Sequence, residues 1–329
     1  MTDEAPAPGK FVRRRAKEYA DSDIYHAIYL PTNWRAGESY PAIVEYAPNR
    51  AAAFGTTGRV EDCRLGYHLS GGRDCLWIVL PYVNVMERQN QDTWWGDESA
   101  TVDYCLANLA RECDEFGGDR NSVVLVGFSR GAIACGYIGL RNDDIADIWL
   151  GFWAHSHIDG GRFTPMGRDE RMARLRGRPT LLSWGETDGG KPEGERGAAR
   201  LREAGQLVSA FEIAGVGHTD TWIEHDTMDR EKARAWLATL LEKRPGTFTV
   251  RGRLVDVRDQ PIAERVVTCG EWHRSTTDAQ GRFEIRGLTK GLRPLQVAPT
   301  AIYSQVTLPV NITDSDIDLK RVVVPRVSN

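Results

Sequence analysis

The segment Gly127-Phe128-Ser129-Arg130-Gly131 places a serine between two glycines, in the G-x-S-x-G pattern of nucleophilic serines. It follows the apolar run Val123–Val126 and precedes Ala132–Cys135, which can begin a buried helix. A strand, a sharp turn and a helix in this order make the serine oxygen project from the end of a sheet, and the glycines leave room for the turn. The helix N-terminus stabilises negative charge that develops nearby. We therefore predict that Ser129 is a nucleophile; the alternative is a structural serine in a glycine-rich turn.

An acid and a histidine follow this serine, in the chain order found where the serine lies in a strand–turn–helix element of this kind. Asp188 lies just past an apolar, strand-like run and is the preferred acid, with Glu186 as the fallback. His218 comes after two glycines that follow the next such run and is the preferred base, and His225 is a weaker candidate. We expect His218 to take the serine proton while Asp188 orients the imidazole. A serine nucleophile needs both a base and a group that orients the base.

His155 and His157 have the spacing of a pair of metal ligands. No cysteine or second histidine cluster completes a metal site around them. We interpret them as pocket-wall or structural histidines, and we expect neither a metal nor a cofactor.

Tryptophan is abundant, with ten residues against five methionines. Trp94, Trp95, Trp153 and Trp222 lie near the candidate catalytic residues or after predicted strands. Aromatic faces can stack on a sugar or on a phenolic acyl group, so we predict that Trp95 and Trp153 contact substrate. The alternative for each tryptophan is packing beneath a loop.

Short apolar runs alternate with helical patterns through the first three-quarters of the chain. Near-continuous apolar runs are typical of parallel strands that are covered on both faces. Glu98–Phe116 repeats apolar residues with a helical period after a plausible N-cap at Asp97, and Arg230–Lys243 repeats the pattern. The alternation predicts an α/β fold whose mostly parallel sheet is flanked by helices. The expected strands are 24–30, 42–46, 76–80, 122–127, 148–153, 180–184 and 207–213.

The pattern changes at Arg244-Pro245-Gly246. Beyond it, strand-like runs are separated by turn signals such as Asp278-Ala279-Gln280-Gly281. Seven short runs in about 80 residues predict a small antiparallel β-sandwich. We expect two domains, an α/β domain at 1–245 that carries the candidate triad and an all-β domain at 246–329.

Composition excludes several classes of function. The 329 residues carry a net charge of −4 and a pI near 6.0, which argues against a nucleic-acid partner held by bulk charge. No run of 18 apolar residues exists, so we expect no membrane span. Arg13–Arg15 are not followed by an apolar segment, so no secretory signal is expected in this chain; the protein is cytoplasmic by default, or secreted if a leader was removed. Cys63 and Cys75 could form a disulfide or remain free thiols.

From about Tyr25 to Leu241 the chain resembles an α/β-hydrolase of the esterase kind, most of all the polyhydroxybutyrate-depolymerase, feruloyl-esterase and acetyl-xylan-esterase group. The resemblance implies a metal-independent serine carboxylesterase with the triad Ser129, His218 and Asp188. It also implies a small-molecule or carbohydrate ester as substrate, with feruloyl and acetyl esters as the candidates. The segments that carry the resemblance are Ala27–Pro31, Tyr40–Val44, Thr101–Asp103, Phe116–Asp119, Gly127–Gly131, Gly185–Asp188 and Gly217-His218.

The same resemblance implies two backbone donors for the oxyanion. One is the N–H of Arg130, the residue after the nucleophile. The family usually carries His-Gly after the corresponding early strand, where this chain reads Ala47-Pro48-Asn49-Arg50. Because Pro48 has no N–H, Asn49 or Arg50 must supply the second donor. The Arg130 side chain could bind the oxyanion or a substrate carboxylate, or form a structural salt bridge.

Residues 246–329 resemble a carboxypeptidase-regulatory-like, transthyretin-like sandwich through Val250–Asp256, Gln260–Ile262 and Thr276–Phe283. The resemblance implies a scaffold or binding role for this domain, with no catalytic group.

Two rival functions remain open. A serine peptidase of the prolyl-oligopeptidase kind shares the order of the triad, but its usual large N-terminal propeller does not fit in this chain. A non-catalytic binding protein on a degenerate hydrolase fold would explain the missing His-Gly. The acyl and alcohol specificity and the oligomeric state are left open.

Overall fold

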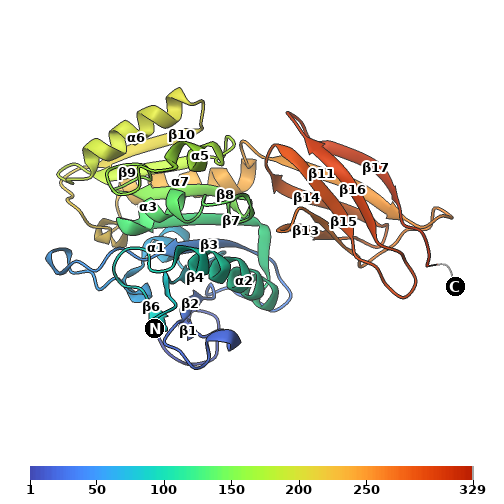
Figure 1. Ribbon diagram of the computed structural model, residues 1–329, viewed down its shortest axis with the longest axis horizontal. Coiled ribbons are helices and arrows are strands. Elements are labelled where there is room, and N and C mark those ends of the chain that lie inside the picture. The colour runs from blue at the N-terminus through green and yellow to red at the C-terminus, as the bar shows by residue number, and fades with distance from the viewer. Residues whose placement is uncertain (328–329) are drawn as a thin grey trace. The chain divides into compact units, whose positions relative to one another are not determined.

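The computed structural model describes residues 1–327, and the chain forms two compact units (Figure 1). The first unit is Met1–Lys243 and the second begins at Arg244, close to the boundary expected after residue 245.

The first unit is built on an eight-stranded sheet with the strand order β1-β2-β4-β3-β7-β8-β9-β10. Strands β1 and β2 are antiparallel to their neighbours, and the pairs from β4 through β10 are parallel. A separate two-stranded ribbon joins β5 (Val83–Asn84) and β6 (Gln89–Asn90). The strands of the large sheet are β1 (Phe11–Arg14), β2 (His26–Tyr29), β3 (Tyr40–Tyr46), β4 (Leu76–Leu80), β7 (Gly118–Phe128), β8 (Trp149–His155), β9 (Thr180–Gly185) and β10 (Val208–Ile213).

The central strands are apolar because both faces of the sheet are covered. Every residue of β4 and β8 is buried, and so is the apolar half of β7. Parallel strands covered on both faces have this composition. All seven strands expected in this unit are present, and β1 is an additional edge strand in the arginine-rich segment near the N-terminus.

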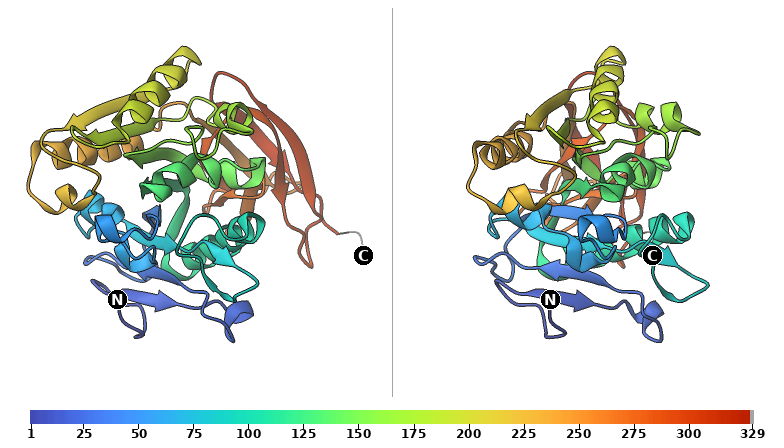
Figure 2. Two further views of the ribbon diagram at one scale, coloured as in Figure 1. Left: turned by 60° about the vertical axis from the view of Figure 1, so that its left-hand side comes forward. Right: turned by 90° about the vertical axis from the view of Figure 1, so that its left-hand side faces the viewer.

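Helices flank the strands of this sheet, with α1 packed against α7 and α3 packed against α5 (Figure 2). Helix α2 begins after Asp97, whose side chain accepts a 2.8 Å hydrogen bond from the N–H of Ala100, so the expected N-cap is confirmed. The helices are α1 (Leu65–Ser70), α2 (Glu98–Phe116), α3 (Arg130–Tyr137), α4 (Asp143–Ala146), α5 (Arg168–Ala173), α6 (Lys191–Glu203) and α7 (Met228–Lys243). Short 3₁₀ helices are η1 (Lys17–Tyr19), η2 (Ala52–Phe54), η3 (Val60–Asp62) and η4 (Thr221–Glu224).

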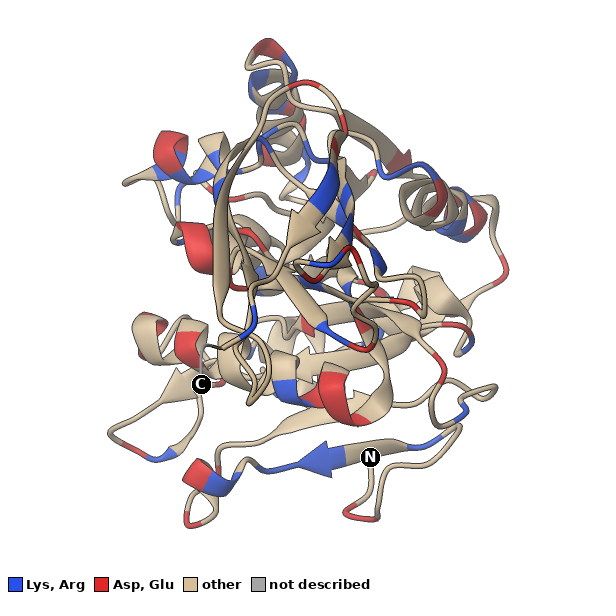
Figure 3. Cartoon of the chain, turned by 90° about the vertical axis from the view of Figure 1, so that its right-hand side faces the viewer, with Lys and Arg blue, Asp and Glu red and all other residues tan. Residues whose placement is uncertain are grey.

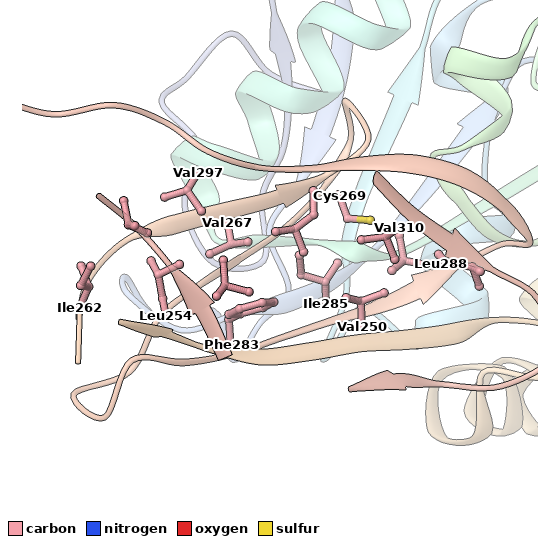
Figure 4. Packing of buried hydrophobic residues seen from close by; sticks show 14 residues of the cluster. Val250, Leu254, Ile262, Val267, Cys269, Phe283, Ile285, Leu288, Val297 and Val310 are labelled. Carbon is pink, nitrogen blue, oxygen red and sulfur yellow. The ribbon is translucent and has the colours of Figure 1, made fainter. Parts of the chain in front are cut away.

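The second unit consists of two small sheets, with the strand orders β14-β11-β17 and β13-β12-β15-β16. Their strands enclose a core of their own, in which Val250, Leu254, Ile285 and Leu288 are fully buried (Figure 4). Strand β11 pairs with β17 in parallel, so the expectation of a purely antiparallel sandwich is wrong. The strands are β11 (Phe248–Val255), β12 (Val266–Cys269), β13 (His273–Thr276), β14 (Arg282–Leu288), β15 (Gly291–Val297), β16 (Val306–Ile312) and β17 (Ile317–Val323).

Charged residues of both signs are interspersed along the chain (Figure 3). On the β11–β17 sheet, arginines pair with nearby aspartates, as Arg321 does with Asp259 at 2.8 Å. Cys63 and Cys75 are both buried thiols and are not joined by a disulfide. Within residues 1–327, no helix has the length and apolar character needed to cross a membrane.

Candidate active site

Ser129 occupies the sharp turn between β7 and α3. Its backbone lies at φ 55° and ψ −116°, a conformation that costs energy for any residue with a side chain, and its N–H donates to the carbonyl of His155 at 3.1 Å. The flanking glycines are required by space. A Cβ on Gly127 would lie 2.2 Å from the carbonyl carbon of Gly131, and a Cβ on Gly131 would lie 2.1 Å from the carbonyl oxygen of Tyr46. The two glycines of the turn therefore pack directly against each other, and Gly131 also packs against the backbone of strand β3, so neither position has room for a side chain.

A continuous hydrogen-bonded chain joins the three residues predicted to form a triad. The Nε2 atom of His218 lies 3.0 Å from Oγ of Ser129, and its Nδ1 atom lies 3.0 Å from Oδ1 of Asp188. The Asp188 side chain is fully buried, and His218 is 14% exposed. The fallback candidates lie elsewhere: Glu186 accepts a hydrogen bond from the N–H of Gly215, and His225 is exposed at the end of η4.

The topology of the sheet brings these residues together. Strands β7, β9 and β10 are parallel, so their carboxyl ends meet at one edge of the sheet. Ser129 follows β7, Asp188 follows β9 and His218 follows β10. The two loops that carry the acid and the base are also joined, because the N–H of Thr187 donates to the carbonyl of Val216 at 3.0 Å.

The environment of Asp188 keeps its carboxyl ionised. Burial alone would raise the pKa of Asp188, but hydrogen bonds from His218 and from the N–H of Gly190 outweigh it and lower the pKa to about 2. The carboxylate can therefore hold His218 with Nδ1 protonated, which leaves Nε2 free to accept the serine proton.

The two other histidines near this edge of the sheet have different roles. His155 is fully buried, and it contacts Oγ of Ser183 through Nδ1 and Trp222 through Nε2. Burial lowers its pKa to about 4, so it is a neutral structural residue. His157 lies with its ring 5.2 Å from that of His218, and burial, reinforced by the nearby His218, lowers its pKa. It forms part of the pocket wall, and no cluster of potential metal ligands occurs within residues 1–327.

A cavity of about 600 Å³ opens over Ser129 and His218. Its aromatic wall consists of Phe54, Trp94 and Phe163, and the rings of the last two lie 5.0 Å apart. Phe54 also packs edge-on against His218 at 4.8 Å. The sequence analysis did not predict Phe54 and Phe163 as cavity residues. Both lie in loops that follow parallel strands, β3 and β8, and this position in the sequence could have identified them as candidates.

Two tryptophans predicted to contact substrate do not line this cavity. Trp153 is completely buried in β8 and donates to Oγ of Ser183 at 2.8 Å, so that prediction is wrong. Trp95 packs against Tyr137, with the ring centres 4.7 Å apart, and is not one of the residues that line the cavity, so that prediction is also wrong. Trp94, the residue before Trp95, does line the cavity.

The side chain of Arg130 is buried and surrounded by backbone carbonyls. Its Nη1 donates to Trp94 at 2.7 Å and Gln91 at 3.4 Å, and its Nη2 donates to Pro48 at 2.8 Å and Gly58 at 3.0 Å. Nε donates to Ala47 at 3.4 Å, and the guanidinium lies 4.0 Å from the centre of the Tyr82 ring. All five N–H groups are thus used. The expectation that this side chain binds an oxyanion or a substrate carboxylate is wrong, and its partners are carbonyls rather than the carboxylate of a salt bridge.

One of the two candidates for the second oxyanion donor is already occupied. The N–H of Arg50 donates to the carbonyl of Asp92 at 2.8 Å. Asn49 lines the cavity with Ser129, and its side-chain oxygen accepts the N–H of Trp94 at 2.7 Å. Within residues 1–327 the backbone N–H of Asn49 has no hydrogen-bond partner, which leaves it available.

No protein-family model and no curated protein matches this chain. Among solved structures, a double mutant of the esterase rPPE aligns with a TM-score of 0.50 and 15% identity, over 70% of this chain and 83% of that one. An esterase from Rhizomucor miehei aligns with a TM-score of 0.49 and 14% identity, over 73% and 86% of the two chains. A ferulic acid esterase aligns with a TM-score of 0.46 and 15% identity, over 71% and 98%.

At such identities the likeness to the rPPE structure concerns the fold alone. The first unit has an α/β-hydrolase fold. Its mostly parallel sheet carries Ser129 in a sharp turn after β7, and the second unit contains two small β-sheets of its own.

Proposed function

We propose that this protein is a serine carboxylesterase that acts through Ser129, His218 and Asp188. The observation that carries the proposal is the unbroken chain of 3.0 Å contacts from Asp188 through His218 to Ser129, at the base of an open cavity. A serine alcohol is a weak nucleophile until a base can take its proton, and this geometry provides the base and the group that orients it.

The reaction proceeds in two halves. Oγ of Ser129 attacks the ester carbonyl while its proton passes to Nε2 of His218, and the carbonyl electrons form an oxyanion. The oxyanion collapses, the bond to the alcohol breaks, and the alcohol leaves with the proton from His218. Water then gives a proton to Nε2 of His218 as it attacks the acyl-enzyme and forms a second oxyanion. This oxyanion collapses, the acid leaves, and His218 returns the proton to Oγ of Ser129.

Two backbone N–H groups stabilise the oxyanion in this proposal. The N–H of Arg130 is at the first position of helix α3, where it has no partner inside the helix. The N–H of Asn49 is the second donor. Losing one such donor typically costs roughly 10²–10³ in rate, so both donors matter for catalysis.

The cavity supports an ester whose acyl group or alcohol contains a ring. Phe54, Trp94 and Phe163 offer apolar faces beside the nucleophile, and aromatic faces stack on phenolic rings and on sugars. Feruloyl esters of carbohydrates are therefore the leading substrates, with acetyl esters as the second class. We assign no catalytic group to the second unit, for which we propose a transthyretin-like scaffold or binding role.

Hydrolysis assays on the full chain test the proposal. We expect turnover of p-nitrophenyl acetate and of methyl ferulate, labelling of the protein by a fluorophosphonate, and loss of both in Ser129→Ala. Turnover of a peptide amide with comparable efficiency would instead identify a peptidase. A folded wild-type protein that neither turns over esters nor labels would be a non-catalytic binding protein.

A further inference from the structure

We propose that the guanidinium of Arg130 is a positioning residue that orients the Pro48–Asn49 peptide, so that the Asn49 N–H completes the oxyanion hole. Arg130 would then serve the reaction twice, through its own backbone N–H and through its side chain. The inference rests on the proposed function, because an oxyanion forms only if acyl transfer takes place.

The orientation follows from the geometry of one peptide bond. The carbonyl of Pro48 and the N–H of Asn49 belong to the same planar unit, and within residues 1–327 no peptide bond is cis. In a trans peptide these two groups point in opposite directions. The Pro48 oxygen accepts a hydrogen bond from Nη2 of Arg130 at 2.8 Å, so the Asn49 N–H faces away from the guanidinium. Asn49 and Ser129 line the same cavity.

The guanidinium also joins segments that are distant in the sequence. Its carbonyl cradle, defined as the carbonyl groups of Ala47, Pro48, Gly58, Gln91 and Trp94, includes the loop after β3 and the loop before α2. The two loops approach so closely that a Cβ on Gly58 would lie 2.0 Å from the carbonyl oxygen of Asp92. Asn49 is thereby fixed by Arg130 at one end of its peptide and by Trp94 at its side chain.

A lysine could not replace this arrangement. The arginine fork presents five donors in a fixed plane, whereas a lysine ammonium has three donors on a flexible stem. A buried carbonyl that loses its hydrogen-bond donor is still removed from water, which is unfavourable. The peptide groups of the cradle would therefore reorient to find other donors. Arg130→Lys therefore keeps the positive charge but loses most hydrogen bonds to the carbonyl cradle. The variant distinguishes an effect of the charge on the rate from an effect of the peptide's orientation.

Arg178 supplies a matched control for the same substitution. It too is fully buried, and its guanidinium donates to the backbone carbonyls of Leu175, Ala146, Trp149 and Arg174. It precedes β9, at the opposite end of the strand from Asp188. Arg178→Lys should lower the melting temperature and leave the kcat of the folded enzyme unchanged.

The kinetic experiment compares Arg130→Lys and Arg178→Lys with p-nitrophenyl acetate as substrate. We expect kcat to fall ~10²-fold in Arg130→Lys, as for loss of an oxyanion donor, with KM within about threefold. Affinity for phenyl trifluoromethyl ketone should fall in parallel, because Ser129 adds to this ketone, its proton passes to His218 and the carbonyl oxygen becomes an oxyanion. An unchanged kcat in Arg130→Lys, or a lower kcat with unchanged ketone affinity, would overturn the inference.

A double-mutant cycle tests whether Arg130 acts through the Asn49 N–H. Asn49→Pro removes that N–H and should lower kcat ~10²-fold. Asn49→Ala keeps the N–H and should lower kcat much less. Adding Arg130→Lys to Asn49→Pro should cost little more, because the group to be positioned is already absent. Fully multiplicative losses would show that Arg130 acts independently of this peptide.

Hydrogen–deuterium exchange tests the positioning role of Arg130 without requiring the protein to turn over a substrate. Arg130→Lys should speed exchange in residues 47–58 and 89–96, and Arg178→Lys should not. If the wild-type protein hydrolyses no ester, the proposed function fails, while exchange still shows whether the guanidinium holds the two loops. Unchanged exchange in Arg130→Lys refutes the positioning role even in an active esterase.

Discussion

The backbone N–H of Trp94 donates to the side-chain oxygen of Asn49 at 2.7 Å. One residue of the aromatic wall is therefore hydrogen-bonded to the residue that supplies the candidate second oxyanion donor. Trp94 itself has a φ of 55°, which is unusual for a bulky residue, and this hydrogen bond helps to hold it there. In the proposed mechanism, this hydrogen bond couples one of the ring-binding residues to one of the two oxyanion donors.

Replacing Trp94 by alanine should change substrate preference more than chemistry. Loss of an aromatic contact is expected to lower kcat/KM for methyl ferulate ~3–10-fold relative to ethyl acetate, an ester without a ring, since such contacts are worth about 0.5–1.5 kcal/mol. Steady-state kinetics on both esters measures the ratio. The matched control is Trp95→Phe, which alters the neighbouring ring outside the cavity lining and should leave the ratio unchanged. Equal losses on the two esters in Trp94→Ala would contradict a ring-binding role.

Replacing Asp188 by asparagine should preserve the fold and remove most of the activity. The amide cannot hold His218 in the tautomer that accepts the serine proton, and the equivalent change in a serine-protease triad lowers kcat by about 10⁴. Circular dichroism and kcat of purified Asp188→Asn test this. Glu186→Gln changes the neighbouring exposed carboxylate and should keep wild-type activity. The reverse result would move the acid to Glu186.

Asp220 should make the stability of the protein depend on pH. Its side chain is buried two residues after His218; Oδ1 lies 3.3 Å from Nε of Arg64, and Oδ2 has no hydrogen-bond partner within residues 1–327. Burial raises the pKa of Asp220 from 3.8 to about 7, although Arg64 opposes the shift. The folded state therefore binds this proton more tightly than the unfolded state does. Between about pH 4 and pH 7 the contribution to stability falls as pH rises, and above pH 7 the buried carboxylate is destabilising.

Asp220→Asn should remove this penalty. We expect the variant to gain at least ~3 °C more in melting temperature, relative to wild type, at pH 8 than at pH 5. Thermal unfolding of both proteins across this range provides the measurement. A gain that is the same at both pH values would mean that Asp220 does not titrate in this window.

The second unit should fold without the first. A fragment that begins at Arg244 contains its own buried core, so we expect it to melt cooperatively. Leu254→Ala in that fragment should lower the free energy of unfolding by about 2–5 kcal/mol, as for other fully buried leucines. Leu292→Ala, at a leucine that is 72% exposed, is the control and should have little effect. A fragment without a cooperative transition would show that its core is insufficient.

The local patterns predicted much of the fold because they report burial directly. The apolar runs became strands of the large sheet, and the periodic segment after Asp97 became α2. Strand β1 was not predicted, because an edge strand has one open side and can therefore carry Arg13 and Arg14. The serine, acid and histidine could be ordered from sequence because each follows a parallel strand at the same edge of the sheet.

The walls of the cavity were harder to predict, because they depend on contacts between distant segments. Trp153 lies near the end of a strand, yet β8 is covered on both faces, so nearness to the edge of the sheet did not expose it. The role of the Arg130 side chain depends on carbonyl groups from loops up to 83 residues away. The residues next to an arginine in the sequence do not show whether its guanidinium donates to backbone carbonyls or to a carboxylate.

The position of Trp94 gives the protein a natural optical reporter. All ten tryptophans lie within residues 1–327, and Trp94, which is 39% exposed, is the most exposed of them and lies in the cavity wall. A ligand that covers its indole should change the intensity and wavelength of its fluorescence against the constant emission of the more buried rings. Titration of Ser129→Ala with unlabelled esters could then measure ground-state binding constants, without turnover and without a chromogenic leaving group.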